Sequence, residues 1–237
     1  MDAILFAFLL TLVQQPGPPT LPPPPPVLVV TGNARILATP DEATVRLGIV
    51  RQATTAQVAQ EQANAAAQEI LSAIQKAGAP ANQIQTARLV LSPIYAPRNP
   101  DSRDVPRIVA YNATNTVSVR LTNLSIIGPV IDAGLKAGAN QIDGVGFGLR
   151  NDLPSRQQAL KEAVEEARSK AQVMADAARV GIIEVLEVSE GGVSVVDRFE
   201  APLNGRVFAA ATETPVSPGQ IELRASITIR YRIAPKP

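Results

Sequence analysis

The sequence predicts an α+β fold, with antiparallel or mixed sheets and three helices packed mainly on one side. Several segments alternate apolar and polar residues, which is typical of strands with one buried and one wet face. Three other segments repeat apolar residues at helical spacing. The predicted order is β-β-α-β-β-α-β-α-β-β. Because the strands are amphipathic and not continuously apolar, we expect the helices to gather on one side of the sheets.

The first two strands are predicted before any helix. Residues 27–30 form a short β-branched run that leads into residues 31–33 (TGN). Residues 42–51 alternate, which predicts a half-buried strand. One face of that strand carries Ala43, Val45, Leu47 and Ile49.

The first helix is predicted to run from a threonine N-cap, Thr54 or Thr55, to about Ala77. A threonine hydroxyl can accept a main-chain N–H at a helix start. Gly78 and the following Pro80 then end the helix. Its apolar face carries Val58, Ala66, Ile70 and Ile74, with Ala63, Ala67 and Leu71 beside them.

A long hairpin is predicted next. Its strands cover residues 84–96 and 107–121, and the polar, proline-rich loop 97–106 joins them. One face of the second strand carries Val109, Tyr111, Ala113, Val117, Val119 and Leu121, and the other carries Asn112, Thr114, Thr116, Ser118 and Arg120.

A shorter helix is predicted over residues 123–137. Pro129 would cost about 3 kcal/mol in a helix interior, because it removes a hydrogen bond and clashes with the preceding turn. We therefore expect either a bend at Pro129 or a helix that begins near Gly128. Residues 140–150 are predicted to form the next strand.

The third helix has Pro154 at a natural N1 position and Asp152 as a candidate cap. Glu166 and Lys170 are four residues apart, a spacing that allows an ion pair. Packing is expected to decide this helix, because each large apolar side chain that is buried contributes roughly 1.5–3 kcal/mol. The predicted apolar stripe consists of Leu160, Ala163, Val164, Ala167, Ala171, Met174 and Ala178.

Two strands complete the predicted order. Residues 182–190 form the first, and residues 191–218 have little regular pattern and are expected to form a long loop. Residues 221–233 alternate clearly and predict a strand with one wet face. The inward face carries Ile221, Leu223, Ala225, Ile227, Ile229, Tyr231 and Ile233, and the outward face carries Glu222, Arg224, Ser226, Thr228, Arg230 and Arg232.

The N-terminal segment is interpreted as an export signal. Residues 3–13 are continuously apolar, too short for the ~20 residues of a spanning helix but suited to a signal peptide. We predict a signal peptide over residues 1–15, a proline-rich tether over 16–26 and a domain over 27–237, with no transmembrane span in the mature chain. The alternatives are an N-terminal strand for the apolar run and a ligand for a proline-recognising groove for the tether.

The composition argues against most catalytic chemistry. The 237 residues include no histidine and no cysteine, so the commonest acid–base group, thiolate nucleophiles and zinc–thiolate sites are excluded. A net charge of +1 without a basic run does not suit a nucleic-acid partner. Aromatic residues, at 3%, are too few for a stacking surface. We therefore predict a non-enzymatic protein with no catalytic residues, no cofactor and no metal site.

Three patterns resemble functional motifs but favour structural interpretations. Residues 144–148 (GVGFG) lack the last glycine of a dinucleotide-binding fingerprint and lie inside a predicted strand. We interpret them as structural glycines that allow close backbone approach. Asp132 with Lys136, and Asp101 with Asp104, are candidate acid–base or calcium groups, but neither pair has supporting ligands at the required spacing.

Five blocks follow one another along the chain: TGNARILATPDEATVRLGI near Thr31, QIQTARLVLSPIYAPR near Gln83, VAYNATNTVSVRLTNL near Val109, IDAGLKAGANQIDGVGFGL near Ile131 and ALKEAVEEARSKAQVMADAA near Ala159. Together they resemble the SIMPL domain family, also known as DUF541, which includes periplasmic immunogenic proteins of Gram-negative bacteria. The agreement covers about residues 31–190 and the final strand. Pro129, and the lack of a basic residue before the apolar run, depart from the family pattern.

The resemblance implies an α+β fold, a periplasmic or outer-membrane-associated location, and in some members an oligomeric envelope protein linked to stress tolerance. We therefore expect a non-catalytic protein that acts as a homo-oligomer or through an envelope protein partner. A periplasmic small-molecule or peptide binding module is one alternative, and an enzyme that uses only carboxylates, lysine or serine is another. Kinase regulation would follow from the family name alone. The glycosylation sequons at Asn112 and Asn123 have little meaning in a bacterial envelope protein.

Overall fold

The computed structural model describes residues 25–97, 105–197 and 214–236, and its elements confirm the predicted order. The predicted signal peptide and most of the tether therefore lie outside the described residues. The elements are β1 (Val27–Ala38), β2 (Glu42–Ala53), α1 (Ala56–Lys76), β3 (Ile84–Tyr95), β4 (Ile108–Leu121), α2 (Ile127–Lys136), β5 (Gln141–Gly148), α3 (Leu153–Ala177), β6 (Val180–Asp197) and β7 (Ile221–Pro235). Short 3-10 turns, Ala81–Gln83 and Leu124–Ile126, precede β3 and α2.

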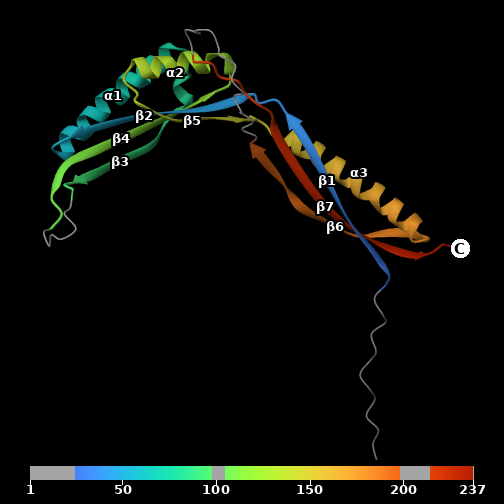
Figure 1. Cartoon of the computed structure of the whole chain (residues 1–237). Coiled ribbons are helices and arrows are strands. Elements are labelled where there is room, and N and C mark those ends of the chain that lie inside the picture. The colour runs from blue at the N-terminus through green and yellow to red at the C-terminus, as the bar shows by residue number, and fades with distance from the viewer. Residues whose placement is uncertain (1–24, 98–104, 198–213, 237) are drawn as a thin grey trace, which may run out of the picture.

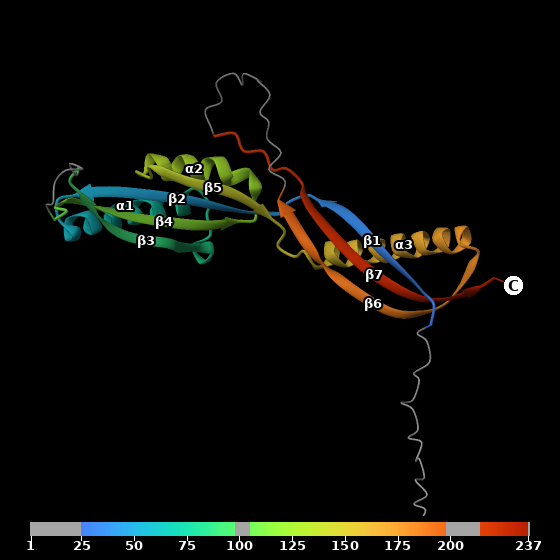
Figure 2. The same ribbon diagram turned by 60° about the horizontal axis from the view of Figure 1, so that its bottom comes forward.

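The strands form two separate sheets, and each sheet belongs to its own lobe. The first has three strands in the order β1-β7-β6, and the second has four in the order β3-β4-β2-β5. Every pairing is antiparallel. Figure 1 shows the lobes side by side with all three helices on the same side of the strands, as predicted. Figure 2 shows β1 of one lobe running on into β2 of the other.

The four-stranded lobe has the larger apolar core, formed by β2, β4, α1 and α2. Ala43, Val45, Leu47 and Ile49 are all buried, which confirms the predicted inward face of β2. Thr55 caps α1 as predicted, because its hydroxyl accepts the main-chain N–H of Val58. The side chain of Val58 is exposed, however, so its predicted place on the apolar face was wrong. The buried stripe of α1 consists of Ala59, Ala63, Ala67, Ile70 and Ile74.

The second helix begins at Ile127, which confirms the expectation that Pro129 forces a late start. Pro129 lies in the first turn, where a missing main-chain donor costs no hydrogen bond. The side chains of Ile127, Val130 and Ile131 are buried in the core of this lobe.

The three-stranded lobe is built on an alanine stripe. The face of α3 that contacts β1, β7 and β6 consists of Ala159, Ala163, Ala167, Ala171 and Ala175, all of them buried. Leu160 and Val164 pack beside this stripe, but Met174 is 46% exposed, so its predicted place on the stripe was wrong. The smallest side chains line the contact because the helix approaches the sheet closely.

Gly32 of β1 is the position where that approach is tightest. A Cβ atom on Gly32 would lie 2.0 Å from the carbonyl oxygen of Ala163 and 2.6 Å from the main-chain nitrogen of Ala167. Gly32 lies within β1, which continues to Ala38, beyond the predicted run of residues 27–30. A strand glycine of this kind marks the contact of one backbone with another.

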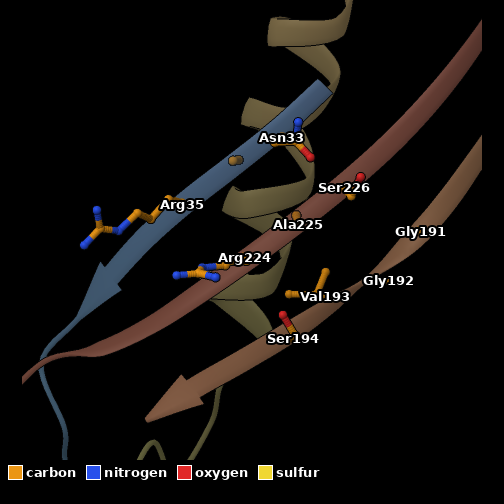
Figure 3. A pocket seen from close by; sticks show the side chains of 10 residues that line it. Asn33, Arg35, Gly191, Gly192, Val193, Ser194, Arg224, Ala225 and Ser226 are labelled. Carbon is orange, nitrogen blue, oxygen red and sulfur yellow. The ribbon is translucent and has the colours of Figure 1, made fainter. Parts of the chain in front are cut away.

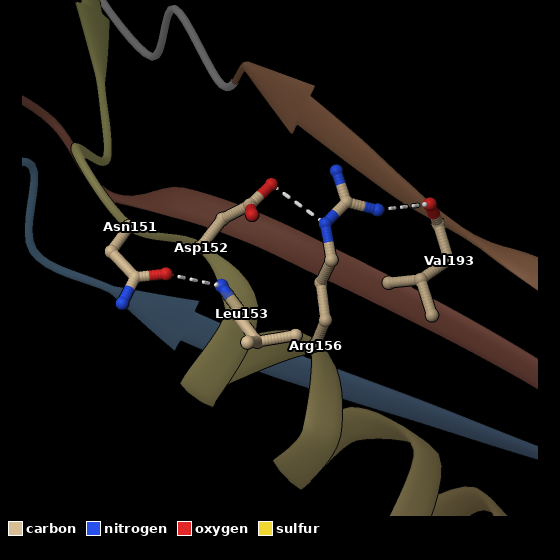
Figure 4. Close-up of polar contacts among 5 residues, drawn as sticks. All are labelled: Asn151, Asp152, Leu153, Arg156 and Val193. Atoms are coloured by element: carbon tan, nitrogen blue, oxygen red, sulfur yellow. Dashed lines mark hydrogen bonds and ion pairs between the residues drawn. The ribbon is translucent and has the colours of Figure 1, made fainter.

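The start of α3 differs from the prediction in its cap. Asp152 occupies the N-cap position but makes no capping hydrogen bond, and Asn151 Oδ1 accepts the main-chain N–H of Leu153 at 3.1 Å. Asp152 instead binds Arg156 Nε at 2.6 Å. Arg156 Nη1 then donates to the carbonyl oxygen of Val193 at 2.9 Å, which ties the helix start to β6 (Figure 4). The sequence did not predict this role because Val193 is remote along the chain.

The sixth strand is much longer than the predicted residues 182–190. It runs from Val180 to Asp197 and includes Gly191 and Gly192, which were expected to lie in a loop. The pairing with β7 shifts register three times, once between Glu190 and Gly192, so the glycines accommodate an irregularity in the ladder. Residues 198–213 of the predicted loop lie outside the described residues.

The last strand confirms the predicted alternation with one exception. Ile221, Leu223, Ala225, Ile227, Ile229 and Tyr231 are buried on the α3 side. Glu222 was expected to face water, and its side chain is instead fully buried. Arg35 of the neighbouring strand β1 and Arg224 of β7 both form ion pairs with this buried carboxylate.

Two connecting segments join the lobes, and a third, residues 214–220, leads from the four-stranded lobe into β7. Two polar side chains hold these segments. Asp41 accepts the main-chain N–H of Arg150 at 2.7 Å, which ties the β1–β2 connection to the β5–α3 connection. Asp132 of α2 accepts the hydroxyl of Thr214 at 2.6 Å, while Val216 packs on the core of the four-stranded lobe. The third segment therefore crosses α2 before it enters β7.

Because the backbones of α3 and β1 are in contact at Gly32, a methyl group added at this position should destabilise the fold. Gly32→Ala should lower the free energy of unfolding by about 3 kcal/mol or more, because the helix backbone must move away from β1. Chemical denaturation of the full chain measures this change. Gly146→Ala on β5 is the control, since nothing lies within 4 Å of its Cβ position, and it should stay within about 1 kcal/mol of wild type. Equal losses in the two variants would contradict the account of this contact.

Candidate interaction site at the sheet edges

Two open sheets give the described part of the chain four edge strands, namely β1, β6, β3 and β5. An edge strand has neighbours on one side only, so alternate main-chain N–H and C=O groups lack a partner within the sheet. Such groups can pair with another chain unless the protein covers them. The four edges differ in how well they are protected.

The β1 edge is closed by α3. Glu166 accepts the main-chain N–H of Asn33, and Lys170 Nζ donates to the carbonyl oxygen of Thr31 at 3.2 Å. Glu166 and Lys170 also form the predicted ion pair, with 2.9 Å between Nζ and Oε1. The Asn33 N–H, followed by Lys170, lowers the pKa of the Glu166 carboxyl below its ordinary value. These two side chains occupy two main-chain groups near the middle of β1 that another strand would need.

The β5 edge is short and irregular. It has eight residues, and its pairing with β2 shifts register between Arg46 and Leu47. Gly144 has a φ of +129°, a conformation that favours glycine at the irregular position. Nothing lies within 4 Å of a Cβ built on Gly144 or Gly146, so the predicted close backbone approach was wrong. The glycines lie within a strand, as expected, and not at a strand-to-helix turn of the kind that binds phosphate.

The β6 edge is long and carries exposed apolar side chains on both faces. Val185 and Val188 pair with Tyr231 and Ile229 and therefore lie on the α3 side. Val188 is nevertheless 58% exposed, because α3 lies mainly over β1 and β7. The exposed apolar residues of β6 are Ile183, Val185, Leu186, Val188 and Val195. An uncovered edge strand of this composition is typical of a surface that pairs with another chain.

The β3 edge has the same character in the other lobe. Leu89 and Leu91 pair with Asn115 and Ala113, so they lie on the α1 side of the sheet. Leu89 is 57% exposed because α1 lies over β4 and β2. Arg88 is the only charged residue of the strand and pairs with Thr116, on the opposite face. The edge strands β3 and β6 therefore both carry exposed apolar side chains on the helix side of their sheets and charged side chains on the opposite side.

Of the carboxylates singled out in the sequence as candidate acid–base or calcium groups, only Asp132 lies within the described residues. Asp132 binds the hydroxyl and the main-chain N–H of Thr214, which gives it a structural role. Asp101 and Asp104 lie outside the described residues. Within the described ranges, no group of three or more aspartate or glutamate side chains could hold a metal ion. The first sequon residue, Asn112, lies in β4, and the second, Asn123, accepts the main-chain N–H of Ser125.

Comparison with known proteins finds matches along most of the chain. The model of the SIMPL family, described as a protein of unknown function (DUF541), matches residues 28–231. The chain belongs to the SIMPL family. It is 32% identical over 212 residues to the 26 kDa periplasmic immunogenic protein of Brucella melitensis biotype 1, covering 87% of this chain and 84% of that protein.

Two further relatives of this SIMPL chain carry names that assign no activity. The uncharacterized protein YggE of Escherichia coli K12 is 30% identical over 150 residues, which are 63% of this chain and 59% of the relative. The YggE protein of Edwardsiella ictaluri is 28% identical over 184 residues, which are 78% and 74% of the two chains. None of the helices in the described residues is both long and apolar enough to cross a membrane.

Closure of the β1 edge should depend on pH. Because the folded-state pKa of Glu166 is lowered, its stabilising contact is present above pH 4.5 and is lost as the pH falls through the lowered pKa. The NMR shift of the Asn33 amide proton should follow this titration. Glu166→Gln should abolish the titration, whereas Glu165→Gln, one residue away on the same helix, should leave it in place. An Asn33 amide that titrates equally in both variants would contradict the contact.

Proposed function

We propose that this SIMPL protein is a non-catalytic periplasmic protein that assembles with copies of itself by pairing its β6 edge with the β3 edge of the next copy. The observation that carries the proposal is the contrast between the four edges. The β1 edge is covered by Glu166 and Lys170, and β5 is short and irregular. Two long edges with exposed apolar side chains remain.

The side chains of the two edges suit each other face by face. On the helix side, Val185 and Val188 of β6 would lie beside Leu89 and Leu91 of β3 in a continuous sheet. These side chains are exposed in the single chain, and their burial stabilises at about 25 cal/mol per Å² of apolar surface. A shared sheet would therefore cover both apolar faces at once.

The charges favour pairing of unlike edges over pairing of like edges. The described charged side chains of β6 are Glu184, Glu187 and Glu190, and the only charge of β3 is Arg88. Glu184 and Glu187 lie on the face opposite α3, where they bind Arg232 and Arg230. Two β6 strands side by side would bring acids together, which destabilises a sheet. Pairing of unlike edges continues from copy to copy and gives a closed ring or an open chain.

Single lysine substitutions at the edges test this interface. Val188→Lys and Leu89→Lys should each abolish assembly of the exported full chain, because lysine on an edge strand opposes pairing. Val173→Lys is the control, since that side chain is 67% exposed on α3 and away from both edges. Size-exclusion chromatography with light scattering measures the mass. A wild-type chain that is monomeric at all concentrations would contradict self-assembly and leave an envelope protein as the partner of these edges.

Mixing the two edge variants distinguishes the proposed arrangement from a symmetric one. The Val188→Lys chain keeps an intact β3 edge, and the Leu89→Lys chain keeps an intact β6 edge. An equimolar mixture should therefore form a dimer that contains one copy of each and grows no further. A symmetric β6–β6 interface would give no such dimer, because every contact would need two intact β6 edges.

The periplasmic location rests on the name of the Brucella relative and on the apolar run of residues 3–13. Cell fractionation should place the protein in the periplasmic fraction, with a mature N-terminus that mass spectrometry finds near residue 16. An uncleaved chain in the cytoplasm would contradict export. Recovery of the protein with outer-membrane vesicles would support the outer-membrane association that the family resemblance implies. Sensitivity of a deletion strain to envelope stress would test the implied role in stress tolerance.

A further inference from the structure

The outer face of the three-stranded sheet, opposite α3, contains a cavity of about 650 Å³. Figure 3 shows the side chains that line it from β1, β7 and β6, with α3 behind the sheet. The polar lining consists of Asn33, Arg35, Ser194, Arg224 and Ser226, and Gly191 and Gly192 lie at its β6 side. We propose that this cavity binds a small oxyanion, the phosphate or carboxylate group of a soluble ligand. This binding is additional to the proposed assembly.

A buried carboxylate holds the two arginines of the cavity in place. Arg35 and Arg224 lie directly opposite each other on neighbouring strands, where two like charges would repel. Glu222 is fully buried between them, with 2.6 Å from Oε1 to Arg224 Nε and 3.0 Å from Oε2 to Arg35 Nε. The two arginines and Glu222 therefore carry one net positive charge.

The same contacts leave hydrogen-bond donors for a ligand. Both distances to Glu222 involve the Nε atoms, and about half of each arginine side chain stays exposed. The terminal Nη groups of Arg35 and Arg224 are thus available, and guanidinium groups suit the geometry of phosphate and carboxylate oxygens. Fixing donors in advance through a second layer of contacts is a common feature of binding sites.

The other residues that line the cavity provide uncharged hydrogen-bond donors and leave room for a ligand. Ser194 and Ser226 have hydroxyl groups and Asn33 has an amide, each able to donate to an oxyanion. Gly192 has a φ of +96°, and nothing lies within 4 Å of its Cβ position, so the cavity is open at the irregular part of β6. None of the residues that line the cavity is aromatic, which argues against a sugar-stacking ligand.

Binding of inorganic phosphate and of citrate to the exported full chain tests the proposal. Each probe is titrated separately by calorimetry, so that the result distinguishes a phosphate ligand from a carboxylate one. Wild type should bind one of them saturably, and Arg224→Gln should weaken binding by about tenfold or more, because a charged donor is lost. Arg230→Gln is the matched control, since Arg230 lies on the same strand and face but binds Glu187 outside the cavity.

A second variant keeps the test decisive if Arg224→Gln does not fold. Ser226→Val leaves the ion pairs of Glu222 intact and places two methyl groups in the cavity, so binding should again be lost. Saturable binding of neither probe by wild type, or equal loss in Arg230→Gln, would overturn the proposal. The same titration on the monomeric Val188→Lys variant separates it from assembly, because the cavity should bind with or without a second copy.

Discussion

The close contact between α3 and β1 is the constraint on which the rest of the three-stranded lobe depends. Alanines alone line the contact face of the helix, and Gly32 lets the two backbones approach. At this distance a single helix cannot cover three strands. It lies over β1 and β7, and Glu166 and Lys170 reach past the sheet to close the β1 edge. The β6 strand is left with its apolar face half uncovered. The β6 edge is therefore open because α3 packs tightly against β1, at the other edge of the sheet.

The two lobes repeat one arrangement with different helices. In each, helices cover one face of an antiparallel sheet, and one long edge strand remains outside the helical cover. The connecting segments between the lobes are held by Asp41 and Asp132, so the two open edges belong to one connected body. A molecule with two unlike open edges has the geometry that lets copies add in one direction. The sheet faces opposite the helices stay free in such an assembly, which leaves the cavity beside Arg224 accessible.

Local sequence patterns were sufficient to predict the element order, the Thr55 cap, the late start of α2 and the buried face of β7. Two of the errors involve contacts between residues that are far apart in sequence. The buried Glu222 pairs with Arg35 of β1, and Asp152 is not a capping side chain because it binds Arg156, which reaches β6. The candidate site could not be predicted for the same reason. Alternation identifies β3 and β6 as strands, but only the sheet order reveals that they are edges. Glycine at position 32, just after the β-branched run of residues 27–30, was the one local signal of the tight helix contact.

Hydrogen exchange at two protein concentrations tests the central claim most directly, because it reads main-chain amides on every edge of the same unmodified chain. If β6 pairs with β3 of the next copy, peptides that cover residues 84–95 and 180–190 should exchange more slowly at the higher concentration. Peptides from β1 and β5 should exchange at the same rate at both concentrations. Slower exchange on β1 or β5 alone, or no dependence on concentration at any edge, would contradict the account.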